Sequence, residues 1–105
     1  MYNFAVKSVI TSNEMAKPLS LSSNQDYDTK EEALEALELQ YNIIEGFLNS
    51  GNLSFLEGVT SYNIVDSKID TNNKNSDSYE VEGWYLGSDS VLYKAHYTGS
   101  IKEVV

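Results

Sequence analysis

The stretch from Thr29 to Gly51 constrains this chain most, because it can be read as one long amphipathic helix with both ends marked. Thr29 and Glu32 form a capping box, in which the Thr29 hydroxyl can accept the backbone N–H of Glu32 while the Glu32 side chain reaches back to Thr29. Gly51 can take the left-handed conformation that closes a last helical turn. The apolar side of such a helix must pack against other elements, so the rest of the chain must provide an apolar surface for it.

The apolar side chains of this stretch fall on one broad arc when successive residues are placed about 100° apart. They are Ala33, Ala36, Leu37, Tyr41, Ile43, Ile44, Phe47 and Leu48, with Leu34 at the edge. The opposite side carries an acidic ridge, defined here as Glu31, Glu35, Glu38 and Glu45, together with Asn42 and Asn49. Like charges at this spacing cost about 0.2–0.5 kcal/mol per pair. Burying one Leu, Ile or Phe gains about 1.5–3 kcal/mol, so packing outweighs the repulsion.

Two strands are predicted before the helix. Residues Tyr2 to Ile10 alternate apolar and polar side chains, the period of a strand with one buried face. The polar connection that follows is long for a loop, so a short second strand over Lys17 to Ser22, paired with the first, is expected. Pro18, the only proline, would confine that strand to an edge of the sheet.

After the helix, the apolar pattern of Ser61 to Ile69 slips by one position, which predicts a strand with a bulge or a bend. The Leu53 to Val59 stretch leads into it. Asp70 to Ser78 reads DTNNKNSDS, and this composition predicts a solvated loop with no core residue.

The clearest hairpin joins Tyr79–Leu86 to Val91–Thr98 through a three-residue tip at Ser88–Ser90. The tail from Gly99 to Val105 either extends the last strand or hangs free. One register places tyrosines of both strands on one face and charged residues with Trp84 on the other. Its predicted pairs are Tyr85 with Tyr93, Val81 with Tyr97, Glu82 with His96, and Trp84 with Lys94.

These elements predict a single domain over residues 1–105 of the α+β class. An antiparallel sheet of about four to five strands, with the long helix packed on one face, satisfies the order strand, weak strand, helix and three strands. The helix and the tyrosine-rich side of the hairpin then cover each other.

Charge and composition limit the classes of partner that this protein can bind. Sixteen Asp and Glu face seven Lys and no Arg, and residues 26–50 hold -6 of the net charge of -9. This balance argues against direct binding to nucleic acid, whose phosphates need positive partners. The first residues lack the basic and apolar regions of a secretory signal, and no apolar run approaches the ~20 residues of a membrane span. The expected location is therefore the cytoplasm, with no membrane partner.

No catalytic or metal-binding motif stands out. His96 is the only histidine, cysteine is absent, and there is no G-x-S-x-G sequence. Against the calcium-loop motif that would begin at Asp70, the fifth, sixth and twelfth positions are Lys74, Asn75 and Val81, where an oxygen ligand, Gly and Glu are required. We predict no enzyme activity, no catalytic residue, no metal site and no cofactor. His96 is expected to pair with Glu82 across the hairpin.

Two surfaces could bind a partner. The first is the acidic ridge with Asp26 and Asp28 just before it; the alternative is that these charges only keep the protein in solution. The second, called here the hairpin face, has Trp84 and two leucines at its centre, as interface centres often have. It consists of Trp84, Leu86 and Leu92 beside Glu80, Glu82 and Lys94. The alternative is that this face is covered by other parts of the chain.

In size, negative charge and lack of catalytic groups, the chain is similar to small inhibitors encoded by phages and other mobile elements, including anti-CRISPR and anti-restriction proteins that mimic nucleic acid. The likeness implies a non-enzymatic inhibitor that blocks a basic, nucleic-acid-binding surface of a host protein. The alternative is a structural or self-associating protein, such as a homodimer, that uses the hairpin face or an exposed strand edge.

Overall fold

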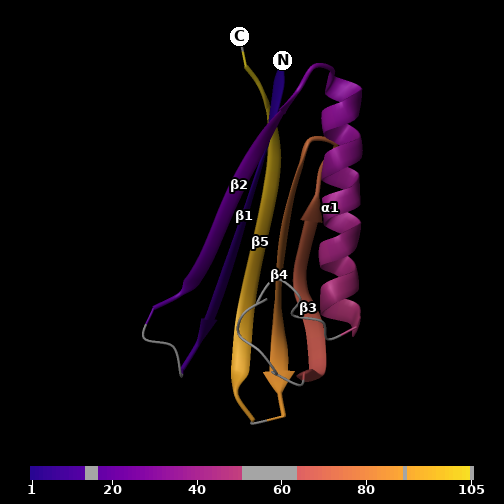
Figure 1. The fold of residues 1–105 in the computed structure, drawn as a ribbon. Coiled ribbons are helices and arrows are strands. Elements are labelled where there is room, and N and C mark those ends of the chain that lie inside the picture. Colours follow the sequence, from indigo (N-terminus) through magenta and orange to yellow (C-terminus); the bar gives the residue numbers. More distant parts are fainter. Residues whose placement is uncertain (14–16, 51–63, 89, 105) are drawn as a thin grey trace.

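The computed structural model describes residues 1–13, 17–50, 64–88 and 90–104. The described chain forms five strands and one long helix (Figure 1). In chain order these are β1 (Tyr2–Ser12), β2 (Leu19–Tyr27), α1 (Lys30–Ser50), β3 (Ile64–Lys74), β4 (Ser78–Gly87) and β5 (Leu92–Glu103). The predicted α+β class and element order are confirmed. The predicted stretch from Leu53 to Val59 lies outside the described residues, as does the start of the Ser61 to Ile69 strand.

All five strands join one antiparallel sheet in the order β2-β1-β5-β4-β3. The first strand therefore pairs with the last, and the two ends of the described chain lie at the same end of the sheet (Figure 1). The backbone N–H of Val104 donates to the carbonyl of Met1 at 2.9 Å. The C-terminal tail extends β5 as far as Glu103, which settles the choice that the sequence left open.

Helix α1 lies across one face of the sheet, and the core is formed between them (Figure 1). From the helix, Ala33, Leu37, Ile44 and Leu48 are buried, while the flanking Ala36, Tyr41 and Phe47 are partly buried. The sheet contributes Phe4, Ile10, Tyr79, Val81, Tyr85, Tyr93, Ala95 and Tyr97. One member of the predicted apolar arc departs from this pattern, since Ile43 is 38 % exposed. It lies at the margin of the arc, on the opposite side of the buried stripe from Tyr41.

Thr29 and Glu32 form two hydrogen bonds at the start of α1, as the capping-box sequence predicts. The backbone N–H of Glu32 donates to Thr29 Oγ1 at 3.2 Å, and the Thr29 hydroxyl donates to Glu32 Oε1 at 3.1 Å. The Glu32 side chain thus accepts a hydrogen bond from the hydroxyl of Thr29. In the standard capping box it would accept one from the backbone N–H of that residue, so this is a variant of the motif.

The hairpin of β4 and β5 has the predicted register, with Tyr85 opposite Tyr93 and Glu82 opposite His96. The remaining predicted pairs, Val81 with Tyr97 and Trp84 with Lys94, are also present. At the tip, the N–H of Gly87 donates to the carbonyl of Val91 at 2.9 Å, which closes a three-residue connection. Ser90 takes a left-handed conformation with φ of 67°, as the last residue of such a tip does.

The predicted loop over Asp70 to Ser78 is wrong for its first half, because β3 continues to Lys74. Only the short turn around 75–77 is irregular, and it is closed by a hydrogen bond of 2.8 Å from the N–H of Asn75 to the carbonyl of Ser78. The strand is an edge strand, so its polar side chains can stay in solvent while its backbone pairs with β4. The irregularity predicted for Ser61 to Ile69 is present as a register shift between Ile64 and Asp66, and a second shift follows between Ile69 and Thr71.

The weak second strand is also longer than predicted. β2 runs from Leu19 to Tyr27 and pairs residue by residue with β1 at the other edge of the sheet. Pro18 stands just before it, consistent with the expected edge position. No helix within the described residues is long and apolar enough to cross a membrane.

Candidate binding surfaces

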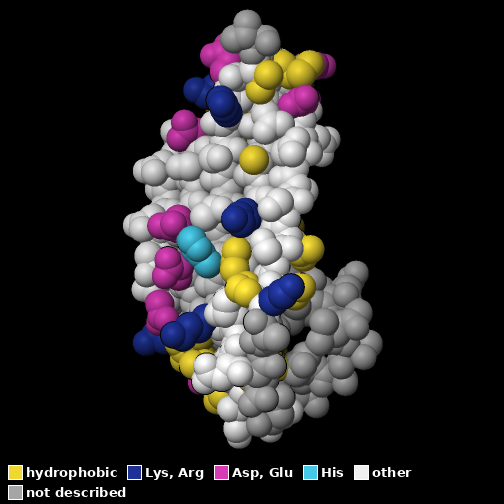
Figure 2. Space-filling model, turned by 90° about the vertical axis from the view of Figure 1, so that its left-hand side faces the viewer, with side chains coloured by type: hydrophobic (Ala, Val, Ile, Leu, Met, Phe, Trp, Pro, Cys, Tyr) yellow, Lys and Arg dark blue, Asp and Glu magenta, His cyan; other side chains and the backbone are white. Residues whose placement is uncertain are grey.

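The structure places the two candidate surfaces on opposite sides of the molecule. The acidic ridge belongs to α1, which covers one face of the sheet, and its Glu38 reaches Lys74 of the edge strand β3. The hairpin face lies on the opposite, open face of the sheet, which Figure 2 shows. One flat partner surface cannot contact both at the same time.

On the acidic ridge, Glu31, Glu35 and Glu38 are exposed and Glu45 is partly buried. Glu38 forms an ion pair with Lys74, whose ammonium also lies 5.5 Å from the centre of the Tyr41 ring. Among the described residues, this is the only ion pair that reaches the ridge. The negative charge available to a partner is therefore concentrated at the N-terminal half of the helix.

The two aspartates expected beside the ridge are separated by the fold. Asp28 is exposed in the short connection between β2 and α1. Asp26 instead lies opposite Asn3 in the β1–β2 pair and accepts a hydrogen bond from Asn3 Nδ2 at 2.8 Å. Since odd-numbered residues of β1 such as Val9 and Thr11 line the open face, Asn3 and Asp26 belong to that face too. Asp26 is therefore not part of the ridge.

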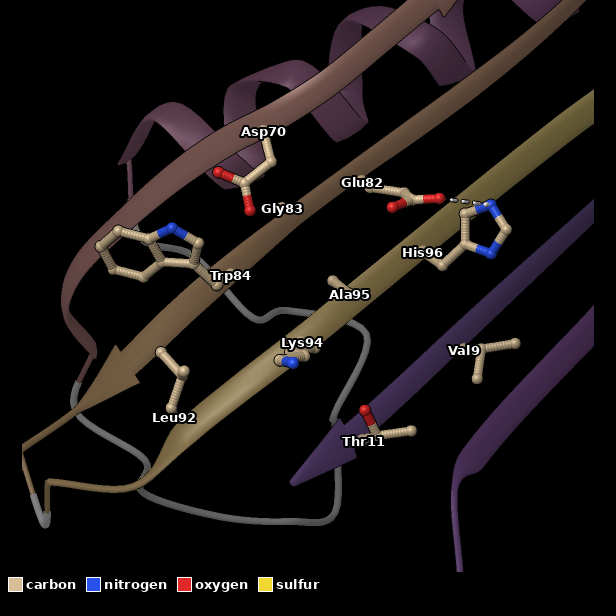
Figure 3. A pocket seen from close by; sticks show the side chains of 10 residues that line it. All are labelled: Val9, Thr11, Asp70, Glu82, Gly83, Trp84, Leu92, Lys94, Ala95 and His96. Atoms are coloured by element: carbon tan, nitrogen blue, oxygen red, sulfur yellow. Dashed lines mark ion pairs between the residues drawn. The ribbon is translucent and has the colours of Figure 1, made fainter. Parts of the chain in front are cut away.

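The open face is hollowed where β1, β3, β4 and β5 meet (Figure 3). The hollow has a volume of about 380 Å³. Trp84 and Leu92 are among the apolar residues that line it, and Leu92 is 44 % exposed. The charged side chains of Asp70, Glu82 and Lys94, together with the imidazole of His96, surround them. A concave apolar patch with a few polar groups around it is a typical binding site for a small molecule or a side chain of a partner.

Sequence reasoning placed Trp84, Leu86, Glu80 and Glu82 on one face but missed other members of the hollow. Leu86 shares the face by register but does not line the hollow. Val9, Thr11 and Asp70 do line it. The alternation of β1 could have shown Val9 and Thr11, since odd-numbered residues of this strand, such as Lys7, face the same side of the sheet. No local pattern pointed to Asp70, because the DTNNKNSDS stretch that begins with it has the composition of a loop.

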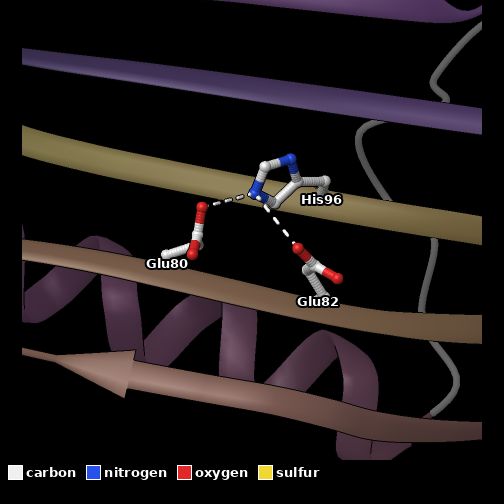
Figure 4. A group of neighbouring side chains, drawn as sticks. All are labelled: Glu80, Glu82 and His96. Carbon is white, nitrogen blue, oxygen red and sulfur yellow. Dashed lines mark hydrogen bonds and ion pairs between the residues drawn. The ribbon is translucent and has the colours of Figure 1, made fainter.

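Beside the hollow, Glu80, Glu82 and His96 converge from β4 and β5 (Figure 4). His96 Nε2 lies 3.0 Å from Glu80 Oε2 and 3.7 Å from Glu82 Oε1. The expected contact between His96 and Glu82 is present, and Glu80 is the nearer partner. Their ligand atoms all lie within 4.8 Å of one another, so the three side chains could hold a divalent cation. Each is about half exposed, and the ion pairs already account for the arrangement.

No family model, curated protein or solved structure matches this chain at a significant level. The geometry and the charge of these two surfaces are therefore the basis on which a function can be assigned.

Proposed function

We propose that this chain is a non-enzymatic binding protein that docks on a basic, nucleic-acid-binding surface of a host protein and blocks it. The observation that carries the proposal is the exposure of Glu31 and Glu35 on the outer side of a 21-residue helix, with no ion pair to either within the described chain. Carboxylates that lack an internal partner keep their attraction for a basic surface outside.

The spacing of the ridge supports nucleic-acid mimicry. Residues four apart on a helix are separated by about 6 Å along its axis. Successive phosphates of one DNA strand follow each other at about 3.4 Å along the duplex axis, so the two charge spacings are of the same order. A groove lined by Lys and Arg could accept the helix in place of a strand.

An inhibitor carried by a phage or another mobile element, of the anti-CRISPR or anti-restriction type, is the setting we propose for such a protein, acting in the cytoplasm. Its target would be an enzyme that handles nucleic acid. Long-range attraction makes the association fast and sensitive to salt, and no chemical step is needed to inhibit the target.

The proposal is tested by capture of partners from a bacterial lysate on the tagged protein, followed by elution in steps of rising salt. The test variant carries Glu31→Lys and Glu35→Lys. The matched control carries Glu80→Lys and Glu82→Lys, which changes the net charge equally on the opposite side of the molecule. Lysines in the first helical turns oppose the helix dipole at a cost of about 0.3–1 kcal/mol each, so circular dichroism must first show that both variants are folded.

We expect a nucleic-acid-handling protein to be captured by the wild type and the control, and lost with the ridge variant. Capture that survives in the ridge variant but is lost in the control would overturn the assignment to the ridge and place binding on the hairpin face. Self-association through the hairpin face stays a prediction.

A further inference from the structure

The outer edge of β2 is a row of backbone groups that no described strand pairs with. β2 pairs with β1 through nine consecutive residues without a register shift. Seven of its nine residues are exposed, and only Leu19 and Tyr27 at its ends are partly buried. The strand is therefore regular, accessible and long enough to pair with another strand.

The two edges of the sheet differ in how well they are protected. Natural edge strands avoid further pairing through bulges, charged side chains or proline. The other edge, β3, has two register shifts and four charged residues, which are Asp66, Lys68, Asp70 and Lys74. β2 has no register shift, no proline and one charged residue, Asp26. Of the two edges, β2 is the one that can accept an additional strand.

Exposed apolar side chains gather on the helix side of this edge. Leu21 lies opposite Ser8, an even-numbered residue of β1 that faces the same side of the sheet as the buried Phe4 and Ile10. Leu21 therefore points to the helix side, and it is 49 % exposed. A hollow of about 320 Å³ between β2 and α1 is lined by Ser23, Gln25 and Leu39 among others. Leu39 is 63 % exposed, and Ile43 follows one turn later on the same stripe of the helix.

We propose that a second copy of this chain pairs with β2 in antiparallel orientation, around a twofold axis at Ser23. This register uses all nine residues of both strands and joins the two sheets into one. It places Leu19 opposite the partner's Tyr27 and Asp26 opposite the partner's Ser20, so no like charges face each other. It also places the partner's Leu21 opposite Gln25, beside the hollow that Gln25 and Leu39 line, and the symmetry repeats this contact.

A second copy fits this edge better than a strand of unrelated sequence, because the edge complements itself. Each copy supplies both an exposed leucine and the hollow that receives it. Two copies repel through their net charge of -9 each, and the β2 edge, with its single acid, is where they can approach at the smallest electrostatic cost. Because directly opposed residues share a face, both helices lie on the same side of the joined sheet, and the two acidic ridges point the same way.

The strength of this contact is expected to be moderate. A nine-residue strand is about 30 Å long, so the strip that it buries falls below the roughly 800 Å² per partner of a standard interface. We expect a micromolar dissociation constant that decreases as salt rises, since salt screens the repulsion between copies. Partner binding through the acidic ridge would weaken with salt, so failure of one proposal can be told from failure of the other.

The test is sedimentation equilibrium of the wild type over micromolar to millimolar concentrations, at low and high salt. In Ser23→Lys, two lysines would face each other across the axis, and we expect the dissociation constant to rise about tenfold or more. Asn73→Lys on β3 is the matched control, because it adds the same charge at an exposed residue of the other edge strand and should leave self-association unchanged. An equimolar mixture of Ser23→Lys and Ser23→Glu should recover the dimer as a heterodimer.

A monomer mass at every concentration would overturn the proposal. So would equal weakening by Ser23→Lys and Asn73→Lys, or a mixture that associates no better than its two components. If Trp84→Ser abolishes a dimer that Ser23→Lys leaves intact, the contact lies on the hairpin face and the β2 assignment is wrong.

Discussion

The hydroxyls of Tyr85 and Tyr97 lie 2.9 Å apart in the core and share a hydrogen bond. Tyr85 comes from β4 and Tyr97 from β5, and each is at most 1 % exposed. Two phenols can thus be buried together under α1 because each satisfies the polar end of the other.

Removing one hydroxyl of this pair should destabilise the protein. Tyr97→Phe leaves the buried Tyr85 hydroxyl without the partner that it has in the structure, and we expect a loss of about 1–3 kcal/mol in the free energy of unfolding, measured by urea denaturation. Tyr85→Phe with Tyr97→Phe removes both polar groups. The double variant should therefore cost less than the sum of the two single variants. Additive losses would show that the two hydroxyls are not coupled.

The core tyrosines also predict loss of stability at alkaline pH. Burial raises the pKa of Tyr79 and of Tyr85 from 10.0 to about 12, with the hydrogen bond from Tyr97 opposing the shift at Tyr85, and burial also raises the pKa of Tyr97. The unfolded chain releases these protons near pH 10 while the folded chain retains them, so stability is complete below pH 10 and falls as pH rises toward 12. Urea midpoints measured between pH 8 and 12 should decrease most steeply above pH 10. A flat profile over that range would contradict the burial of these phenols.

Two glycines should respond in opposite directions to alanine. A Cβ at Gly99 would overlap the ring of the cross-strand neighbour Tyr79 and lie 2.8 Å from its hydroxyl oxygen, so Gly99→Ala should cost about 1–3 kcal/mol through overpacking. A Cβ at Gly46, on the exposed side of α1, meets nothing within 4 Å. Gly46→Ala should therefore raise stability by about 0.5–1 kcal/mol, since alanine loses less entropy in a helix. Thermal unfolding of both variants is the measurement, and a Gly99→Ala protein as stable as wild type would refute the predicted contact.

Ser90 should be improved by glycine. Its φ of 67° is a left-handed conformation, which costs a residue with a Cβ about 1–2 kcal/mol. Ser90→Gly removes this strain at the β4–β5 tip but makes the unfolded chain more flexible, so a net gain of about 0.5 kcal/mol is expected. A calorimetric melting temperature below that of wild type would contradict it.

By itself, the sequence determined the elements whose signals are local. The capping residues Thr29 and Glu32 mark the start of α1, and its apolar stripe identifies most of its buried side. The alternation of the last two strands is strong enough to predict their register, including Glu82 opposite His96. These patterns depend on contacts between residues close in the chain or on a period that one burial face imposes, so they can be read without the fold.

The tertiary structure decided what depends on partners distant in the chain. Asp70 to Lys74 have the composition of a loop, yet they form a strand because β4 offers backbone groups to pair with and the edge leaves their side chains in water. Ile43 belongs to the apolar arc but is 38 % exposed, because it lies at the margin of the arc, about 100° around the helix axis from the buried Ile44. The fold alone also shows that the acidic ridge and the hairpin face lie on opposite sides, since that depends on which face of the sheet the helix covers.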